Sequence, residues 1–193
     1  MPIGLAPYGI RYSVFNKPQV EDAYRKLSLG MLEKFEPADK ALLDERIAKL
    51  WFLTPDCPGE LKVPTRLIDR ASTSDPTGKL YYWVLSTKGI AEYRAGRFPE
   101  AAVHLTRALE MTPATTPQCK VFSGLFLSMA MGRQGQRDQA RQTFRQAAEI
   151  MDRHLQVQEG DLGAEWCDWL MCQIVRREAE EVLKSAESPA TRS

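Results

Sequence analysis

The sequence has almost no excess of charge of either sign. Its 193 residues include 26 Lys and Arg against 25 Asp and Glu, which gives a formal net charge of +1. Proteins that bind nucleic acids usually carry a basic excess, because contacts with phosphates supply most of their affinity. We therefore expect no nucleic-acid partner.

Long apolar runs are also missing. No stretch is long enough to span a bilayer, so we expect no membrane partner. The first residues, MPIGLAPYGIRYSVF, lack the charged segment and apolar run that together mark a secretory signal. These two absences predict a cytoplasmic protein.

Cysteine and histidine are scarce. The four cysteines lie in different segments without CxxC spacing: Cys57, Cys119, Cys167 and Cys172. We expect these cysteines to be reduced, partly buried thiols. We expect the chain to bind no metal and no cofactor. Neither His104 nor His154 has a Cys, Asp or His at ligand spacing. A small enzyme that pairs Cys119 with a histidine is the catalytic alternative, and it requires the two side chains to meet across space.

Apolar residues instead recur at helical spacing. Val20, Tyr24, Leu27, Met31 and Phe35 form one stripe. Similar stripes between proline and glycine breaks predict helices over about 43–51, 64–71, 80–95, 99–112, 121–134, 138–154 and 164–184. Nothing reads as a strand of a sheet. We predict one all-α domain of about eight helices over residues 18–184, an irregular lead-in over 1–17 and a disordered tail over 185–193.

Two segments of this helical region repeat each other. AGRFPEAAVHLTRAL aligns with QGQRDQARQTFRQAA at an offset of 135 − 96 = 39 residues. The offset pairs Gly96 with Gly135, Ala101 with Ala140, Leu105 with Phe144 and Ala108 with Ala147. The glycines suit a left-handed residue at the end of a helix, and the alanines suit places where two helices approach closely.

This repeat resembles the tetratricopeptide family, whose units are helix pairs of about 34 residues. The units would span 80–113 and 119–154, and a closing helix would span 164–184. The residues that match the family pattern are Gly89, Ala101, Leu105, Ala108 and Pro113, then Leu127, Ala140, Phe144 and Ala147. The departures are Leu85, Lys88 and Glu92 at the family's tryptophan, leucine and first tyrosine positions, and Ser128 and Asp152 at its glycine and proline positions.

The flanking segments AYRKLSLGMLEKF and EWCDWLMCQIVRREAEEVL extend the resemblance to about residues 20–184. They look like the helical region at the C-terminal end of some large bacterial serine/threonine kinases and WD-repeat proteins. The chain has no Gly-rich loop, HRD or DFG motif, so the resemblance implies no kinase activity. It implies a non-enzymatic, solenoid-like interaction module that binds a peptide or protein on its concave face. A regulatory tail of a kinase-type signalling system is an alternative.

The resemblance places the partner site on the first helix of each pair. The implied residues are Trp83, Ser86, Thr87, Ile90, Tyr93 and Arg94, then Phe122, Leu125, Phe126, Met129 and Arg133. Arg94 and Arg133 share one repeat position and are suited to grip an acidic group or a C-terminal carboxylate. The competing interpretation is that the aromatic residues are core and the arginines are solvated.

Two further patterns, one of charged and one of aromatic residues, each have two interpretations. Arginines four apart, at 133, 137, 141 and 145, indicate a basic stripe along one helix side, which is either a solvated face or a surface for an acidic partner. In the last helix, Trp166 and Trp169 either cap the end of the stack or form a dimer interface. The second case would make the chain a self-associating structural adaptor. Glu178, Glu180 and Glu181 read as a surface charge cluster.

Overall fold

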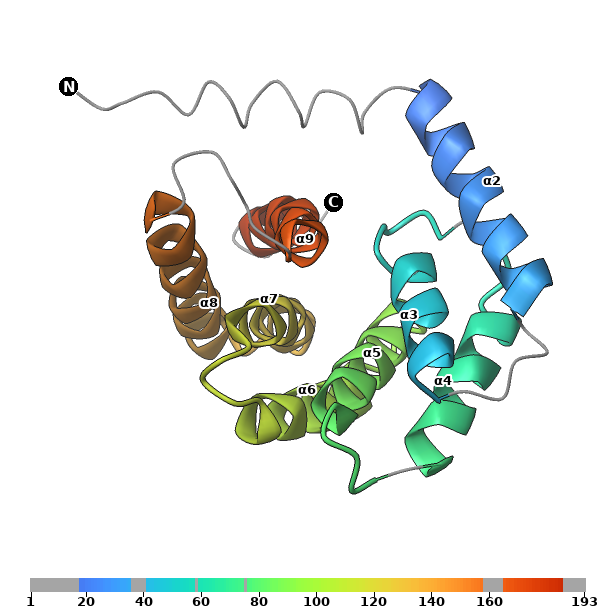
Figure 1. The fold of residues 1–193 in the computed structure, drawn as a ribbon. Helices are drawn as coiled ribbons and strands as arrows, with labels where there is room; N and C mark the ends of the chain where they lie inside the picture. The colour runs from blue at the N-terminus through green and yellow to red at the C-terminus, as the bar shows by residue number, and fades with distance from the viewer. Residues whose placement is uncertain (1–17, 36–40, 58, 75, 158–164, 186–193) are drawn as a thin grey trace.

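The computed structural model describes residues 18–35, 41–57, 59–74, 76–157 and 165–185 (Figure 1). These residues form eight helices and no strand, which confirms the all-α prediction. The helices are α2 (Pro18–Phe35), α3 (Ala41–Trp51), α4 (Lys62–Ser74), α5 (Tyr81–Arg94), α6 (Phe98–Met111), α7 (Pro117–Arg133), α8 (Arg137–Val157) and α9 (Trp166–Ser185). The predicted lead-in over 1–17 and the predicted tail after Ser185 lie outside the described residues.

None of the described helices is both long enough and apolar enough to cross a bilayer. Several predicted helix ends differ from the structure by a few residues; for example, α4 spans Lys62–Ser74 and not about 64–71, and α8 ends at Val157 and not near His154. α7 begins at Pro117, four residues before the predicted start near Val121, because proline is well suited to a first turn that needs no N–H donor. Ser185, which the sequence assigns to the tail, is the last residue of α9.

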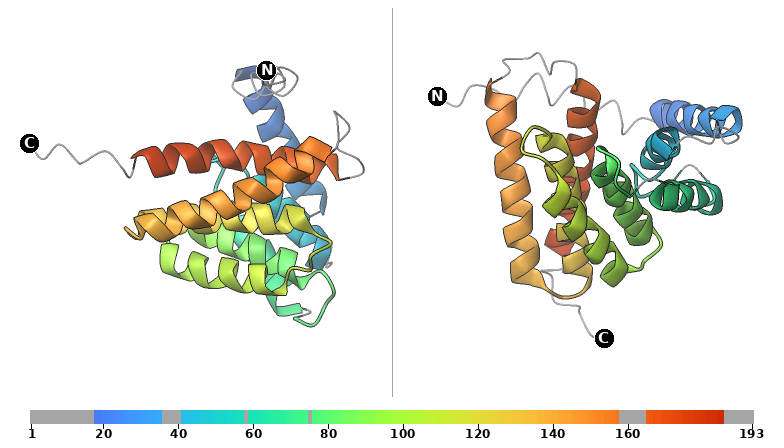
Figure 2. Two further views of the ribbon diagram at one scale, coloured as in Figure 1. Left: turned by 90° about the vertical axis from the view of Figure 1, so that its left-hand side faces the viewer. Right: turned by 60° about the horizontal axis from the view of Figure 1, so that its bottom comes forward.

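The helices pack in sequential pairs. α3 packs against α4, α5 against α6 and α7 against α8, while α3, α5, α7 and α9 also contact one another in that order. In Figure 1, α3 to α8 follow an arc and α9 lies on its inner side. The right-hand view of Figure 2 shows α7 between α8 and α9. We call the side of α3, α5 and α7 that α9 covers the inner face.

The two repeated glycines end α5 and α7 in the same way. Gly96 and Gly135 have φ values of 77° and 78°, in the left-handed region that favours glycine. The residue after each glycine donates its N–H to a carbonyl five positions back, from Arg97 to Glu92 O at 2.9 Å and from Gln136 to Met131 O at 3.0 Å. This is the Schellman arrangement. The predicted left-handed helix ends are confirmed.

Small residues bring paired helices close, but at different heights in the two pairs. A Cβ atom on Gly89 would lie 2.6 Å from Leu105 Cγ, so α5 and α6 approach most closely there. The repeat alignment places Ser128 opposite this glycine. The close approach of α7 to α8 instead lies one turn earlier, at Gly124, whose added Cβ would lie 3.1 Å from Ala147 Cβ.

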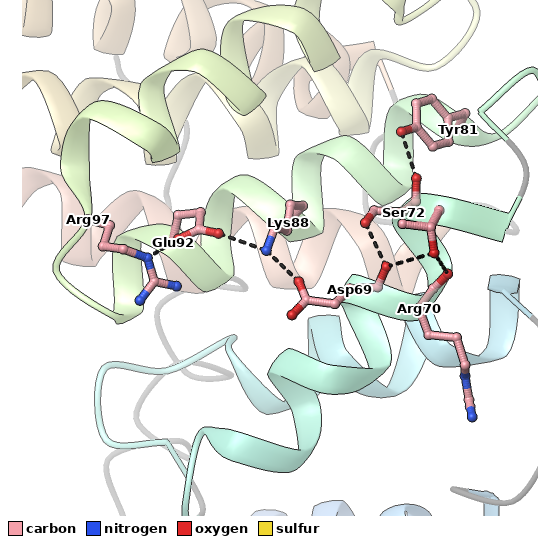
Figure 3. Close-up of polar contacts among 8 residues, drawn as sticks. Asp69, Arg70, Ser72, Tyr81, Lys88, Glu92 and Arg97 are labelled. Carbon is pink, nitrogen blue, oxygen red and sulfur yellow. Dashed lines mark hydrogen bonds and ion pairs between the residues drawn. The ribbon is translucent and has the colours of Figure 1, made fainter.

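A chain of polar contacts joins α4 to α5 (Figure 3). Glu92 pairs with Lys88 at 2.8 Å and with Arg97, and Lys88 also pairs with Asp69 of α4. Lys88 and Glu92 are two of the departures from the tetratricopeptide pattern. Both belong to one ionic network at this junction.

Candidate partner-binding site

The inner face holds most of the residues that the sequence assigns to a partner site, and the structure buries them. Those with less than a tenth of their surface exposed are Trp83, Ser86, Thr87, Ile90, Tyr93, Phe122, Leu125, Phe126 and Met129. Their side chains form the core between α5, α7 and the helices that cover them. For example, Thr87 donates a hydrogen bond to Glu45 of α3, and Ser123 of α7 donates one to Ser86.

Arg94 is buried at the end of α5 and joins three other helices. Its side chain is 5% exposed, and its guanidinium donates to both carboxylate oxygens of Glu178 on α9, at 2.7 Å for Oε2. It also donates to the carbonyl oxygens of Phe52 and Leu53, which follow α3, at 2.9 and 3.3 Å. The guanidinium carbon lies 5.1 Å from the ring centroid of Phe126 on α7. The carboxylate expected from a partner is thus supplied by the chain itself.

A second ionic contact holds the start of α9. Asp168 lies 3.6 Å from Lys49 Nζ and 3.7 Å from Arg46 Nη1, both on α3. The Lys49 side chain is 1% exposed, and its Nζ lies 4.1 Å from the ring centroid of Trp83. Glu45 completes the group at 3.5 Å from the same nitrogen and accepts a 2.8 Å hydrogen bond from Thr87.

The remainder of α9 presents an apolar stripe to the inner face. Its buried residues recur at steps of three and four: Trp169, Cys172, Val175, Ala179 and Val182. Trp169 stacks on His154 of α8 with ring centroids 4.3 Å apart. α9 is therefore an amphipathic helix seated on other helices, with a carboxylate held near each end.

The seat of α9 is imperfectly hydrogen bonded. Five buried side-chain atoms in the described residues have no hydrogen-bond partner, and four of them lie where α9 meets its neighbours: Glu45 Oε2, Lys49 Nζ, His154 Nε2 and Trp169 Nε1. Glu45 Oε2 and Lys49 Nζ keep ion-pair contacts at 3.5–3.6 Å, which are longer than hydrogen bonds. For His154 Nε2 and Trp169 Nε1, a buried polar atom without a partner costs about 1–3 kcal/mol. The contact between α9 and the inner face thus combines good apolar packing with unsatisfied polar atoms.

Sequence reasoning missed the acids and the lysine of this site. Glu178 is 12% exposed on its side chain, so its assignment to a surface cluster is wrong. The signal was present, because Glu178 falls at helical spacing between Val175 and Val182 of the apolar stripe. Glu45 and Lys49 gave a weaker signal, since an i, i+4 pair of this kind is common on exposed helix faces.

The second predicted arginine has a different environment. Arg133 is the last residue of α7, is exposed, and lines a cavity with Arg137. The stripe of four arginines on one helix is wrong at this point, because residues 134–136 form the turn between α7 and α8. The turn nevertheless brings Arg133 and Arg137 to the same cavity.

The thiol of Cys119 lies in the core. Burial raises its pKa to about 11, although hydrogen bonds with Thr112 and Ser123 partly offset that rise. The side chains that hydrogen bond with this thiol, among the described residues, include no histidine. The His154 ring stacks on Trp169 instead, and His104 lies near Lys88, with its pKa lowered by burial and by that charge. Across the same residues, no three His, Cys, Asp or Glu side chains are placed to hold a metal ion.

Two comparisons with known proteins find no match for the chain. No protein-family model matches it, and no curated protein matches it either. The tetratricopeptide resemblance therefore stays a prediction, supported by the 39-residue repeat and by the order in which the helices pack.

Proposed function

We propose that the chain is a non-enzymatic protein-interaction module, built as a tetratricopeptide-like stack of helix pairs, whose inner face binds an amphipathic helix carrying acidic side chains. One observation carries this proposal: α9 seats Glu178 on buried Arg94 and Asp168 on buried Lys49. Helices that bind in grooves use an apolar stripe for affinity, and charge complementarity adds specificity. α9 would be the chain's own occupant of a face that also accepts a partner helix.

The imperfect hydrogen bonding between α9 and the inner face supports the replacement of α9 by a partner helix. A partner helix whose carboxylate approached Lys49 Nζ more closely than the 3.6 Å of Asp168 would gain free energy that α9 does not. A cytoplasmic location belongs to the same proposal, and the four free cysteines agree with a reducing compartment. A regulatory role in kinase-type signalling would use the same face.

The test adds a labelled peptide of residues 165–185 to the full-length chain. The Asp168→Asn/Glu178→Gln variant weakens the hold of the chain's own α9, so we expect it to bind the peptide at least about ten-fold more tightly than the wild type does. A Glu165→Gln/Glu181→Gln variant removes the same charge from exposed positions and should bind as the wild type does. A second peptide with Asn and Gln at positions 168 and 178 should bind the weakened variant less tightly.

Circular dichroism establishes that each variant stays helical. If the acidic and neutral peptides bind the weakened variant equally, the inner face does not select carboxylates. If neither binds, the proposal fails.

Self-association is the second candidate, and it rests on Trp166. This residue begins α9 and is 56% exposed, whereas Trp169 is buried against His154. An exposed tryptophan is a common anchor at protein interfaces. Light scattering over a range of concentrations would show a dimer that Trp166→Ser abolishes, and a monomer at every concentration would exclude this candidate.

A further inference from the structure

A small cavity of about 290 Å³ opens where α7, α8 and α9 meet. It lies between the C-terminal ends of α7 and α9 and the first turn of α8. Its lining is Gly132, Arg133, Gly135, Arg137, Val182 and Ser185. Two of these six residues are cationic and none is acidic, so the side chains that line the cavity carry net positive charge.

Arg133 lies beside an aromatic cluster. Burial raises the pKa of Tyr93, and the nearby Arg133 partly offsets that rise. Tyr93 packs edge-on against Phe126, with ring centroids 5.7 Å apart, and lies 5.5 Å from the ring of Phe98. The exposed Arg133 side chain is therefore next to these rings and within reach of a ligand from solvent.

Arg137 adds a second cation from another helix. It is the first residue of α8, whose N-terminal end carries a partial positive charge from the helix dipole. Neither Arg133 nor Arg137 forms an ion pair with any side chain in the described ranges. The nearby acid Glu178 is already bound to Arg94. Both guanidinium groups therefore keep donors for an external anion.

The size and walls of the cavity limit what it takes. Sites for whole small molecules span about 300–1,000 Å³, so a cavity of about 290 Å³ is at the lower limit and suits one residue of a larger ligand. Val182 supplies an apolar wall, and arginine binds carboxylates through two parallel hydrogen bonds.

We propose that this cavity binds a carboxylate presented by a peptide, either an acidic side chain or a free C-terminal carboxylate. The site is separate from the inner face. It does not require α9 to move, because Val182 and Ser185 of the seated α9 form one of its walls. If the peptide of residues 165–185 did not bind the inner face, the proposal for this cavity would be unaffected.

The test titrates the ¹⁵N-labelled full-length chain with three hexapeptides and follows backbone amide signals. The first is GSGSGV with a free C-terminus, the second is the same peptide amidated, and the third is amidated GSGEGS. We expect the first or third peptide to shift the signals of Gly132, Gly135 and Arg137. The amidated GSGSGV, which has no carboxylate, should leave them unchanged. The comparison of the first and third peptides tells a chain-terminal carboxylate from a side-chain one.

Matched variants assign the binding to the two arginines. Arg133→Gln/Arg137→Gln should weaken binding at least about ten-fold, while Arg145→Gln/Arg153→Gln removes the same charge from exposed positions of α8 and should not. Equal weakening by both variants would mean a general charge effect and would overturn the site. Shifts of the same size with the amidated GSGSGV peptide, or no shifts at all with the wild type, would also overturn it. Tighter binding of inorganic phosphate than of either carboxylate would overturn the ligand class.

Discussion

Glu178 on α9 accepts hydrogen bonds from two nitrogens of the Arg94 guanidinium on α5, although 84 residues separate them in the chain. Both side chains are buried, at 12% and 5% exposed. The pair therefore fixes α9 across the inner face, and it does so where the sequence indicates that a partner's carboxylate would bind.

We expect Arg94→Met to lower the free energy of unfolding by about 3–5 kcal/mol, because it leaves Glu178 as a buried charge without a cation. The Arg94→Met/Glu178→Leu double variant should regain more than half of that loss, since both charges are gone. Urea unfolding followed by circular dichroism measures both values. An Arg94→Met variant as stable as the wild type would show that the pair does not hold α9.

We expect Glu92→Gln to lower the free energy of unfolding at pH 7 by about 1–3 kcal/mol, since it removes charge-assisted hydrogen bonds from Arg97 and Lys88. Burial opposes ionisation of Glu92, but these two hydrogen bonds outweigh it, so its pKa is lowered in the folded protein. A lowered folded pKa gives stability that is present above the unfolded value and lost as the pH falls through the folded value.

The difference between the wild type and Glu92→Gln should therefore shrink below about pH 4. Urea unfolding at pH 7 and at acidic pH measures it. Glu110→Gln, at an exposed position of α6, is the control and should change little at either pH. A difference that stays constant on acidification would argue against the ionic network.

We expect Gly89→Ala to destabilise the fold by about 1–3 kcal/mol, because the added methyl group would overlap Leu105. Gly30→Ala is the matched control on α2, where an added Cβ meets nothing within 4 Å. It should stabilise the chain by up to about 1 kcal/mol through helix propensity. Thermal unfolding of both variants gives the comparison, and a stable Gly89→Ala variant would contradict the close packing of α5 on α6.

We expect Cys167 to be the first thiol alkylated by iodoacetamide in the folded chain. It is the exposed cysteine of the four, while Cys119 and Cys172 are buried. Burial raises the pKa of Cys167 too, but it raises that of Cys119 to about 11 and that of Cys172 well above its ordinary value. A raised pKa leaves less of the reactive thiolate at neutral pH. Mass spectrometry of the modified peptides measures the order. Rapid labelling of Cys119 would revive the enzyme hypothesis.

The sequence predicts the helices well because their signals are local. Apolar spacing marks the stripes, and Gly96 and Gly135 mark two helix ends by a backbone conformation that favours glycine. The site is harder to predict. Periodicity shows that Arg94 and Arg133 share a face, yet it does not show which distant segment covers that face. Glu178 pairs with one arginine and leaves the other at a cavity, and this depends on how α9 is seated.

The one-turn offset between Gly89 and Gly124 also bears on how such a chain can change in length. Each helix pair carries a bulkier residue, Leu85 or Ser128, at the height where the other pair carries its glycine. An exchange of α6 and α8 would therefore place each helix against a partner that lacks a glycine at the height of closest approach. Duplication of a whole pair would keep each glycine with its own partner, so the interchangeable unit of this chain is the helix pair and not the single helix.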